Sequence, residues 1–282
     1  MNAIEIKGLS KSYPGFTLDN IDLELPQGSI MGLVGENGAG KSTTIKLIMN
    51  AIARDAGSVM VLGTDNRDAA FADIKQDIGV VLDEAYYPEV LTARRLNTVM
   101  AHTYRNWDRD CYFDYLQRLS LPEDKEFKDL SRGMKMKLAI AVAMSHKPRL
   151  LILDEATSGL DPMVRDEILD IFNDFTRDEG HSILLSSHIV SDLEKICDYI
   201  AFIHKGRLQF CEEKDRLLEE YAILKLRQSE LEAIPAEAIK GLKTTGYGAE
   251  ALVLKSAAPP NLTPERSTLE DIILLMVKGD AR

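Results

Sequence analysis

A glycine-rich segment that ends in lysine and serine carries the clearest chemical signal in this chain. It fits the pattern G-x-x-x-x-G-K-[ST] and comprises Gly35, Glu36, Asn37, Gly38, Ala39, Gly40, Lys41 and Ser42, followed by Thr43. Glycines let consecutive backbone N–H groups face one anion, and a helix N-terminus adds partial positive charge. Lys41 would reach the β- and γ-phosphates of a nucleotide, and the Ser42 hydroxyl would ligate Mg²⁺. An ordinary glycine turn is the alternative, but every required position is filled.

Two acidic residues follow the apolar run at residues 150–153. Asp154 stands at the predicted end of a buried strand, where its carboxylate can hold Mg²⁺ through water. Glu155 would point differently, toward the γ-phosphate, and could position and polarise the attacking water. The alternative is an acidic pair that caps the next helix. The phosphate loop upstream favours the catalytic interpretation.

Three further segments have a local explanation as well as a functional one. Ser131 and Gly133 precede a helical run, where a helix N-terminus could bind an anion or Ser131 could simply cap the helix. Asp161 ends a loop before Pro162 and could likewise be a cap. His188 follows an apolar strand and could sense the γ-phosphate and hold the water, or be an ordinary polar loop residue.

Strands and helices alternate along most of the chain, which predicts a mainly parallel α/β core. Short strands are expected between residues 3 and 25, with a turn at 13–16. The further predicted strands are 30–34, 78–82, 150–153, 182–186 and 199–204. The predicted helices are 43–49, a mostly helical stretch at 91–146, one from Pro162 and one at 190–196.

The pattern changes near residue 216. A charged helix at 213–221 leads to weak strands at 223–226 and 251–254, and a closing helix is expected at 268–277 with Gly279 beyond its end. We therefore expect a nucleotide-binding domain at 1–215, with a helical subdomain at about 84–147. A small accessory α+β domain would occupy 216–282.

Composition narrows the function classes. The 282 residues carry a net charge of −11, which argues against a broad nucleic-acid surface. The three widely spaced cysteines suggest neither a disulfide framework nor a zinc site. The sequence lacks a signal peptide and a transmembrane stretch, so folding in the cytoplasm is expected, with any membrane role exerted through a partner.

Taken together, these motifs resemble the ATP-binding subunit of an ABC transporter over residues 4–210. The resemblance implies a P-loop ABC ATPase core with an antiparallel β subdomain and a helical subdomain. It makes residues 35–43 the Walker A loop, 130–134 the signature motif and 158–161 the D-loop. It assigns adenine stacking to Tyr13, the Walker B aspartate to Asp154, the catalytic carboxylate to Glu155 and the switch histidine to His188.

Two positions depart from the family pattern. After the strand at 78–82 the family usually has glutamine, whereas Asp83 stands here and could still bind Mg²⁺ through water. The usual double glycine of the signature is Arg132-Gly133. Arg132 could add positive charge near an opposite γ-phosphate or point to solvent, and solvent is slightly favoured.

The family mechanism implies a homodimer that sandwiches two ATP molecules between the phosphate loop of one copy and Ser131, Gly133 and Asp161 of the other. It also implies a transmembrane permease on a separate chain, at the inner face of the cell membrane. The sequence resembles bacterial exporters of antimicrobial or amphipathic peptides, an analogy that narrows the substrate only loosely. A soluble ABC-type ATPase is the alternative, although the chain lacks a long coiled coil and a second cassette. A nucleotide-dependent regulator is a third possibility.

Overall fold

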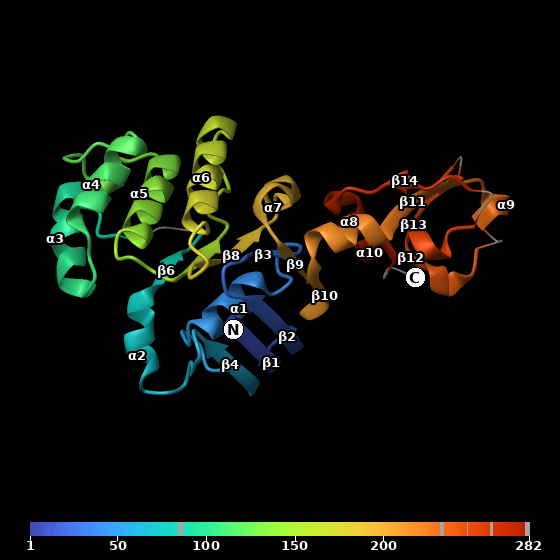
Figure 1. The fold of residues 1–282 in the computed structure, drawn as a ribbon, viewed down its shortest axis with the longest axis horizontal. Coiled ribbons are helices and arrows are strands. Elements are labelled where there is room, and N and C mark those ends of the chain that lie inside the picture. The colour runs from blue at the N-terminus through green and yellow to red at the C-terminus, as the bar shows by residue number, and fades with distance from the viewer. Residues whose placement is uncertain (84–86, 232–233, 247, 260–261, 280–282) are drawn as a thin grey trace.

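The computed structural model describes residues 1–83, 87–231, 234–246, 248–259 and 262–279. Three sheets and their helices form an elongated molecule (Figure 1), with helices α3–α5 at one end and the last strands at the other. The mixed α/β architecture agrees with the predicted fold class.

The central sheet has six strands in the order β10-β9-β3-β8-β7-β6. Its strands pair in parallel, apart from β10, which runs antiparallel to β9. The bounds are β3 Ile30–Val34, β6 Ile78–Val81, β7 Leu150–Asp154, β8 Ser182–Ser187, β9 Tyr199–His204 and β10 Arg207–Glu213. Every residue of β3, β7 and β8 is buried, as expected for parallel strands covered on both faces.

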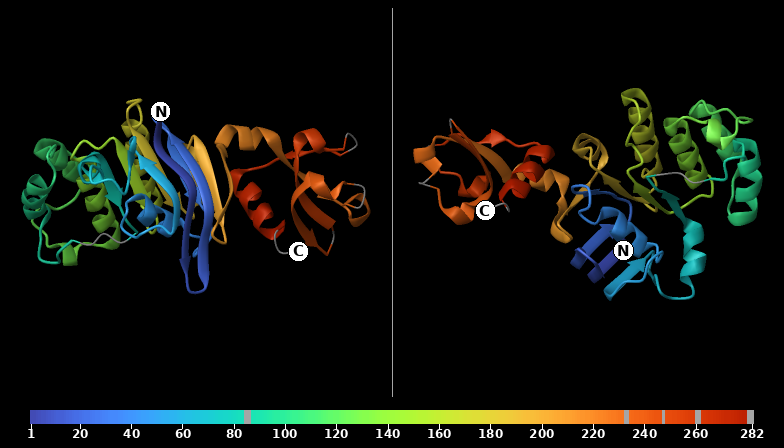
Figure 2. Two further views of the ribbon diagram at one scale, coloured as in Figure 1. Left: turned by 90° about the horizontal axis from the view of Figure 1, so that it is seen from below. Right: turned by 180° about the vertical axis from the view of Figure 1, so that it is seen from behind.

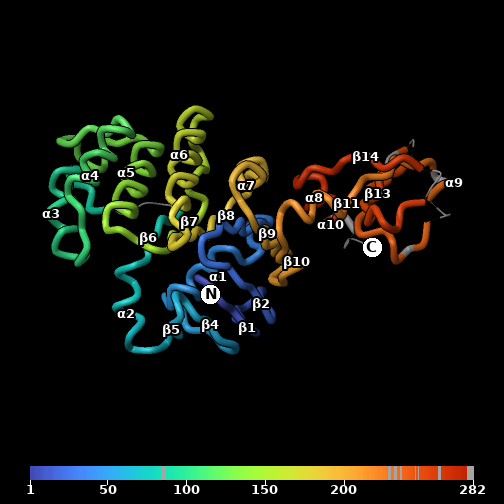
Figure 3. The backbone as a smooth tube through the Cα atoms, viewed as in Figure 1, coloured from blue at the N-terminus to red at the C-terminus, as the bar shows by residue number. Residues whose placement is uncertain are grey.

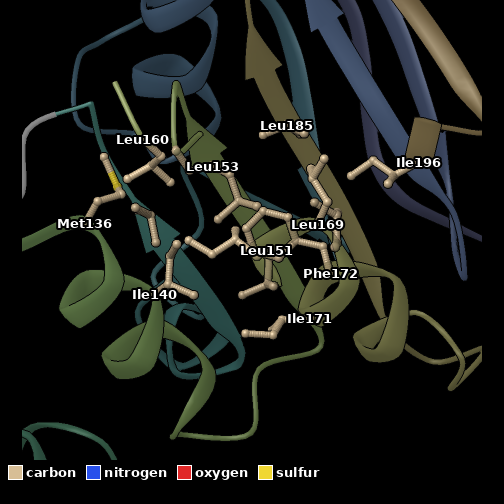
Figure 4. Close-up of a cluster of buried hydrophobic side chains, with 14 of the residues drawn as sticks. Met136, Ile140, Leu151, Leu153, Leu160, Leu169, Ile171, Phe172, Leu185 and Ile196 are labelled. Atoms are coloured by element: carbon tan, nitrogen blue, oxygen red, sulfur yellow. The ribbon is translucent and has the colours of Figure 1, made fainter. Parts of the chain in front are cut away.

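Alternate residues of this sheet enter two different cores. Leu151 and Leu153 join the cluster formed with α5, α6 and α7, whereas Leu150 and Ile152 join the cluster on the opposite face. The first cluster is drawn in Figure 4, where Leu151, Leu153 and Leu185 of the sheet face Leu169 and Phe172 of α6. The helices are α5 Arg132–Met144, α6 Pro162–Phe175 and α7 Val190–Ile196.

An antiparallel sheet covers the other face together with α1 Lys41–Ile48. Its order is β2-β1-β4-β5, with bounds β1 Asn2–Tyr13, β2 Phe16–Pro26, β4 Ala56–Val61 and β5 Thr64–Asp65. The left view of Figure 2 shows it from the side. The expectation of short strands here was wrong: β1 and β2 have 12 and 11 residues, because irregularities in register bend a long hairpin without breaking it.

The helical end contains α3 Ala93–Thr103 and α4 Arg109–Arg118, packed with α5. A shorter helix, α2 Phe71–Ile74, leads into β6. Side chains of Thr92, Asp108, Ser131 and Asp161 cap α3, α4, α5 and α6 respectively. In these four helices the polar residue before the first turn therefore fixes where the helix begins.

The C-terminal end has an antiparallel sheet of order β12-β13-β11-β14. Its elements are α8 Lys214–Glu220, β11 Tyr221–Leu226, α9 Gln228–Leu231, β12 Ile239–Thr245, β13 Gly248–Leu254, β14 Glu265–Arg266 and α10 Leu269–Gly279. Helix α10 includes Gly279, which the sequence placed beyond its end. The expected division at residue 215 falls inside α8 and stays a proposal.

This C-terminal lobe follows β10 at one end of the molecule (Figure 3). It packs against the main body through α10, which contacts α7. Leu269 and Ile272 of α10 belong to the same buried cluster as Leu193 of α7. The Leu269 amide also donates to Glu194 Oε2 at 3.2 Å. In the part of the chain that the structure describes, no helix is long and apolar enough to cross a membrane.

Candidate functional site: a phosphate-binding cleft

The glycine-rich loop connects β3 to α1, which begins at Lys41 (Figure 1). The residue before the helix is Gly40, at φ 119°, and no described side chain caps the first turn. That turn also contains no acidic residue. Its backbone N–H groups are therefore available to an anion, as in phosphate-binding helix N-termini.

Close contacts with β2 and β9 hold the loop in place. A Cβ at Gly35 would lie 2.3 Å from the Ile203 carbonyl oxygen, and one at Gly40 would lie 2.8 Å from Leu18 Cδ1. The Gly206 amide donates to the Ala39 carbonyl at 3.0 Å. Glycine is required at both loop positions because the neighbouring strands leave no room for a side chain.

Lys41 has a buried ammonium group, with 5% of its side chain exposed. Nζ donates to the Gly35 carbonyl at 2.7 Å and to the Glu36 carbonyl at 3.4 Å, and it lies 3.5 Å from Glu155 Oε1. A charge removed from water requires such partners. The structure thus brings Lys41 and Glu155 together from opposite sides of the cleft.

Glu155 has a left-handed backbone, at φ 53°, which turns the chain sharply after β7. Its amide donates to the Ser186 carbonyl at 3.0 Å, so the turn is fixed to β8. Oε2 lies 2.6 Å from His188 Nδ1, and the His188 amide also donates to it at 3.4 Å. A carboxylate held between a lysine and a histidine is well placed to accept a proton from water.

Asp154 is the last residue of β7 and is buried, with Ser186 Oγ donating to its Oδ1. Ser42 lies exposed in the first turn of α1 and lines the cleft, with Thr43 beside it. Hydroxyl and carboxylate oxygens are the donors that Mg²⁺ prefers. Among the described residues no cluster of three or more His, Cys, Asp or Glu could hold a metal by itself.

These elements enclose a cleft of about 680 Å³, large enough for a nucleotide. It is lined by Gly15, Phe16, Glu36, Asn37, Gly38, Gly40, Lys41, Ser42, Thr43, Asp83, Arg132, Glu155, Ser158 and His188. Most of the predicted loop residues thus meet Glu155 and His188 at one cavity. Asp154 is not among the described lining residues.

Tyr13, expected to stack on adenine, is the last residue of β1, is 41% exposed and lies outside the described lining. Phe16, across the hairpin turn, lines the cleft instead. From the sequence, Phe16 was expected only in the turn at 13–16. Its aromatic side chain, three residues after Tyr13, was the available sign that it could line the nucleotide cleft.

Ser131, Gly133 and Asp161 also lie outside the lining described for this single chain. Ser131 Oγ accepts from the Met134 amide at 3.3 Å, and Asp161 Oδ1 accepts from the Val164 amide at 3.1 Å. Both residues therefore act as helix caps here. Their exposed positions leave them able to face a second copy.

Asp83 and Arg132, the two departures from the family pattern, both line the cleft. Arg132 Nη2 lies 3.4 Å from Asp83 Oδ1. The Arg132 side chain is 64% exposed, in keeping with the favoured expectation of a solvent-facing residue, and its guanidinium also reaches Asp83. The segment that follows Asp83, residues 84–86, lies outside the described residues.

Comparison with known proteins gives one consistent result. The sequence pattern of the family described as ABC transporter matches residues 18–158. The lantibiotic transport ATP-binding protein SrtF of Streptococcus pyogenes is 34% identical, over 75% of this chain and 91% of that protein. The ABC transporter ATP-binding protein YtrB of Bacillus subtilis is 31% identical, over 77% and 74%. The bacitracin transport ATP-binding protein BcrA of Enterococcus faecalis is 34% identical, over 73% and 67%.

Solved structures agree. An ATP-binding subunit of an ABC transporter aligns with a TM-score of 0.70 at 28% identity, over 76% of this chain and 91% of that one. A dimeric bacterial ABC transporter cassette aligns with a TM-score of 0.68 at 22% identity, over 74% and 98%, and so supports the fold alone.

Proposed function

This chain belongs to the ABC transporter family as an ATP-binding, ATP-hydrolysing subunit, and we propose that it powers export of peptides or other amphipathic compounds through a membrane-spanning partner. The observation that carries the catalytic part is the meeting of Lys41, Glu155 and His188 at one cleft beside the α1 N-terminus. A phosphate cradle, a cation and a candidate base in one cavity suit phosphoryl transfer to water.

The chemistry follows from these positions. The Lys41 ammonium group would exchange its contact with Glu155 for contacts with the phosphates of ATP. The Glu155 carboxylate, released from Lys41, would then take a proton from the attacking water. The water oxygen bonds to the γ-phosphorus as the bond to the β,γ-bridging oxygen breaks, and ADP leaves. His188 Nδ1, which lies within hydrogen-bond distance of Glu155 Oε2 in this structure, would hold the carboxylate and the water in line with the γ-phosphorus.

Mg²⁺ fits the oxygen donors of the cleft. Ser42 would bind it directly and Asp154 through water, and the ion would neutralise charge on the β- and γ-phosphates. Asp83 was expected as a further ligand, but Arg132 Nη2 lies 3.4 Å from its Oδ1, so we propose that Asp83 pairs with Arg132 and leaves the ion to Ser42 and Asp154. The small number of protein ligands suits Mg²⁺, which keeps several waters and substrate oxygens.

We further propose that two copies sandwich two ATP molecules. Ser131, Gly133 and Asp161 of one copy would face the nucleotide held by the phosphate loop of the other, and Tyr13 would stack on adenine. The exposure of Ser131 and Asp161 in the single chain supports this arrangement.

The membrane role is proposed by analogy with the relatives named for lantibiotic and bacitracin transport. The permease would be a separate chain, and this subunit would lie in the cytoplasm against the inner face of the cell membrane. The net charge of −11 supports neither DNA nor RNA as a partner.

Co-purification from native cells in mild detergent tests the proposal. We expect a multi-spanning membrane protein to co-purify in equimolar amount. The complex of the two proteins should hydrolyse ATP, and a transported compound should raise the rate of hydrolysis. Recovery only from the soluble fraction, with ribosomes, nucleic acid or nothing attached, would replace transport with a soluble ATPase function.

A further inference from the structure

The side chains of Asp83 and Arg132 meet on the wall of the nucleotide cleft. Asp83 lies just after β6, and Arg132 is the first residue of α5. Their contact therefore joins the central sheet to a helix that begins 49 residues later in the chain. Both side chains are more than half exposed, at 54% and 64%. In open water such a pair contributes little to stability.

Two other contacts hold the start of α5 in the same place. The guanidinium of Arg132 lies against Gly159, since a Cβ there would be 3.5 Å from its Cζ and Nε. A Cβ at Gly133 would lie 3.5 Å from Leu160 Cδ2. Figure 4 shows Leu160 beside Met136 of α5, in the buried cluster. Two segments, the end of β6 at Asp83 and the loop at Gly159 and Leu160, thus meet the first residues of α5.

We propose that Asp83 and Arg132 are a positioning pair, which orients the start of α5 so that Ser131 can engage the nucleotide held by the phosphate loop of the second copy. This inference rests on the proposed ATPase function. Opposite charges at positions 83 and 132 are what the geometry requires, and the identity of each residue matters less. Water leaves the cleft when nucleotide and a second copy enter, so the attraction strengthens in the state that hydrolyses ATP.

Independent action of Asp83 and Arg132 on the phosphates would give a different set of mutational effects from a positioning pair. If each charge acted separately on the phosphates, loss of Asp83 would tighten ATP binding and loss of Arg132 would weaken it. The two effects would then add. A positioning pair predicts that both losses act in the same direction and that the second loss costs nothing further.

The test is a double-mutant cycle in the assembly purified from native cells. The variants are Asp83→Asn, Arg132→Gln, both together, and the exchange Asp83→Arg with Arg132→Asp. We expect each single change to lower kcat by roughly threefold to tenfold, with KM for ATP within about twofold of the unmodified protein. The double neutralisation should be no worse than either single change, and the exchange should recover most of the loss.

The pair formed by Arg105 and Asp73 is a matched control, with Nη2 3.1 Å from Oδ1 and similar exposure, at a distance from the cleft lining. Arg105→Gln and Asp73→Asn should leave kcat unchanged. Additive losses in the double neutralisation, or opposite shifts in KM, would overturn the pairing. Lack of ATP hydrolysis by the unmodified assembly would instead refute the proposed function, so the two failures are distinct.

Discussion

Lys41 Nζ lies 3.5 Å from Glu155 Oε1, so the cation of the phosphate loop and the carboxylate that follows β7 neutralise one another before nucleotide binds. ATP must replace this internal partner of Lys41. The same exchange releases Glu155, which links arrival of the phosphates to availability of the base.

Lys41→Ala should weaken ATP binding by about 10- to 100-fold, because charge-assisted hydrogen bonds to the phosphates are lost. Titration with a fluorescent nucleotide measures the affinity. Lys46→Ala, an exposed change on the same helix, is the control and should bind normally. Unchanged affinity in Lys41→Ala would contradict the loop assignment.

Glu155→Gln should lower turnover by about 10²- to 10⁴-fold while ATP still binds and drives dimerisation, because the amide cannot take the proton from water. Phosphate release and light scattering measure the two properties. Glu219→Gln, exposed on α8, should match the unmodified protein. Normal turnover by Glu155→Gln would remove the residue from this role.

His188→Ala should reduce turnover by about 10- to 100-fold, because Glu155 loses a 2.6 Å hydrogen-bond partner. His188→Gln can still donate a hydrogen bond and should retain an intermediate rate. Steady-state phosphate release gives both values, with His102→Ala on α3 as the control. Equal rates for His188→Ala and the control would show that Glu155 needs no such partner.

His146 predicts acid sensitivity of the helical end. Its imidazole is buried, stacks on Tyr104 with 3.9 Å between ring centroids, and has Nε2 3.2 Å from the Ile78 carbonyl. Burial lowers the pKa of His146 below its ordinary 6.5, although the facing carbonyls oppose the shift. The folded protein favours the neutral imidazole. The contribution of neutral His146 to the free energy of unfolding is therefore fully present above pH 6.5 and is lost as pH falls through the native pKa.

The measurement is the free energy of unfolding in denaturant between pH 7.5 and pH 5. The unmodified protein should lose stability more steeply than His146→Gln, by at most about 1.4 kcal/mol per pH unit for one proton. Identical slopes would show that His146 does not take up this proton on unfolding.

Ile272→Ala should destabilise the protein by about 2–5 kcal/mol, because it opens a cavity where α10 meets α7. Leu274→Ala, on the same helix but 49% exposed, should cost far less. Denaturant unfolding compares the two variants. Similar losses in both would mean that the α10 contact contributes little.

Local sequence patterns were enough to predict the phosphate loop and the parallel strands of the central sheet, but not its antiparallel strand β10. Continuous apolar runs mark β3, β7, β8 and β9 because both faces of these strands are covered. By contrast, β4 was not predicted, since Ala56 to Met60 include two small residues and a serine, and the strand depends on pairing with the distant β1. β12 was also not predicted, although it pairs with the neighbouring strand β13.

For the candidate site, the sequence indicated which residue types belong to it, but not which of those residues contact one another. The loop and Glu155 follow from motif and strand end. No local pattern shows that Arg132 reaches Asp83, or that Phe16 and not Tyr13 lines the cleft in this chain. Those contacts depend on how helices and hairpins pack onto the sheet.

The support of the phosphate loop by β9 has a thermodynamic consequence. The Ile203 carbonyl and the Gly206 amide fix the path of the loop through Gly35 and Ala39. The backbone that receives the phosphates is therefore ordered in the absence of nucleotide, and binding loses little chain entropy there. Changes in the β9–β10 turn should then appear as an entropic penalty on ATP affinity, even though no residue of that turn is among the described lining of the cleft.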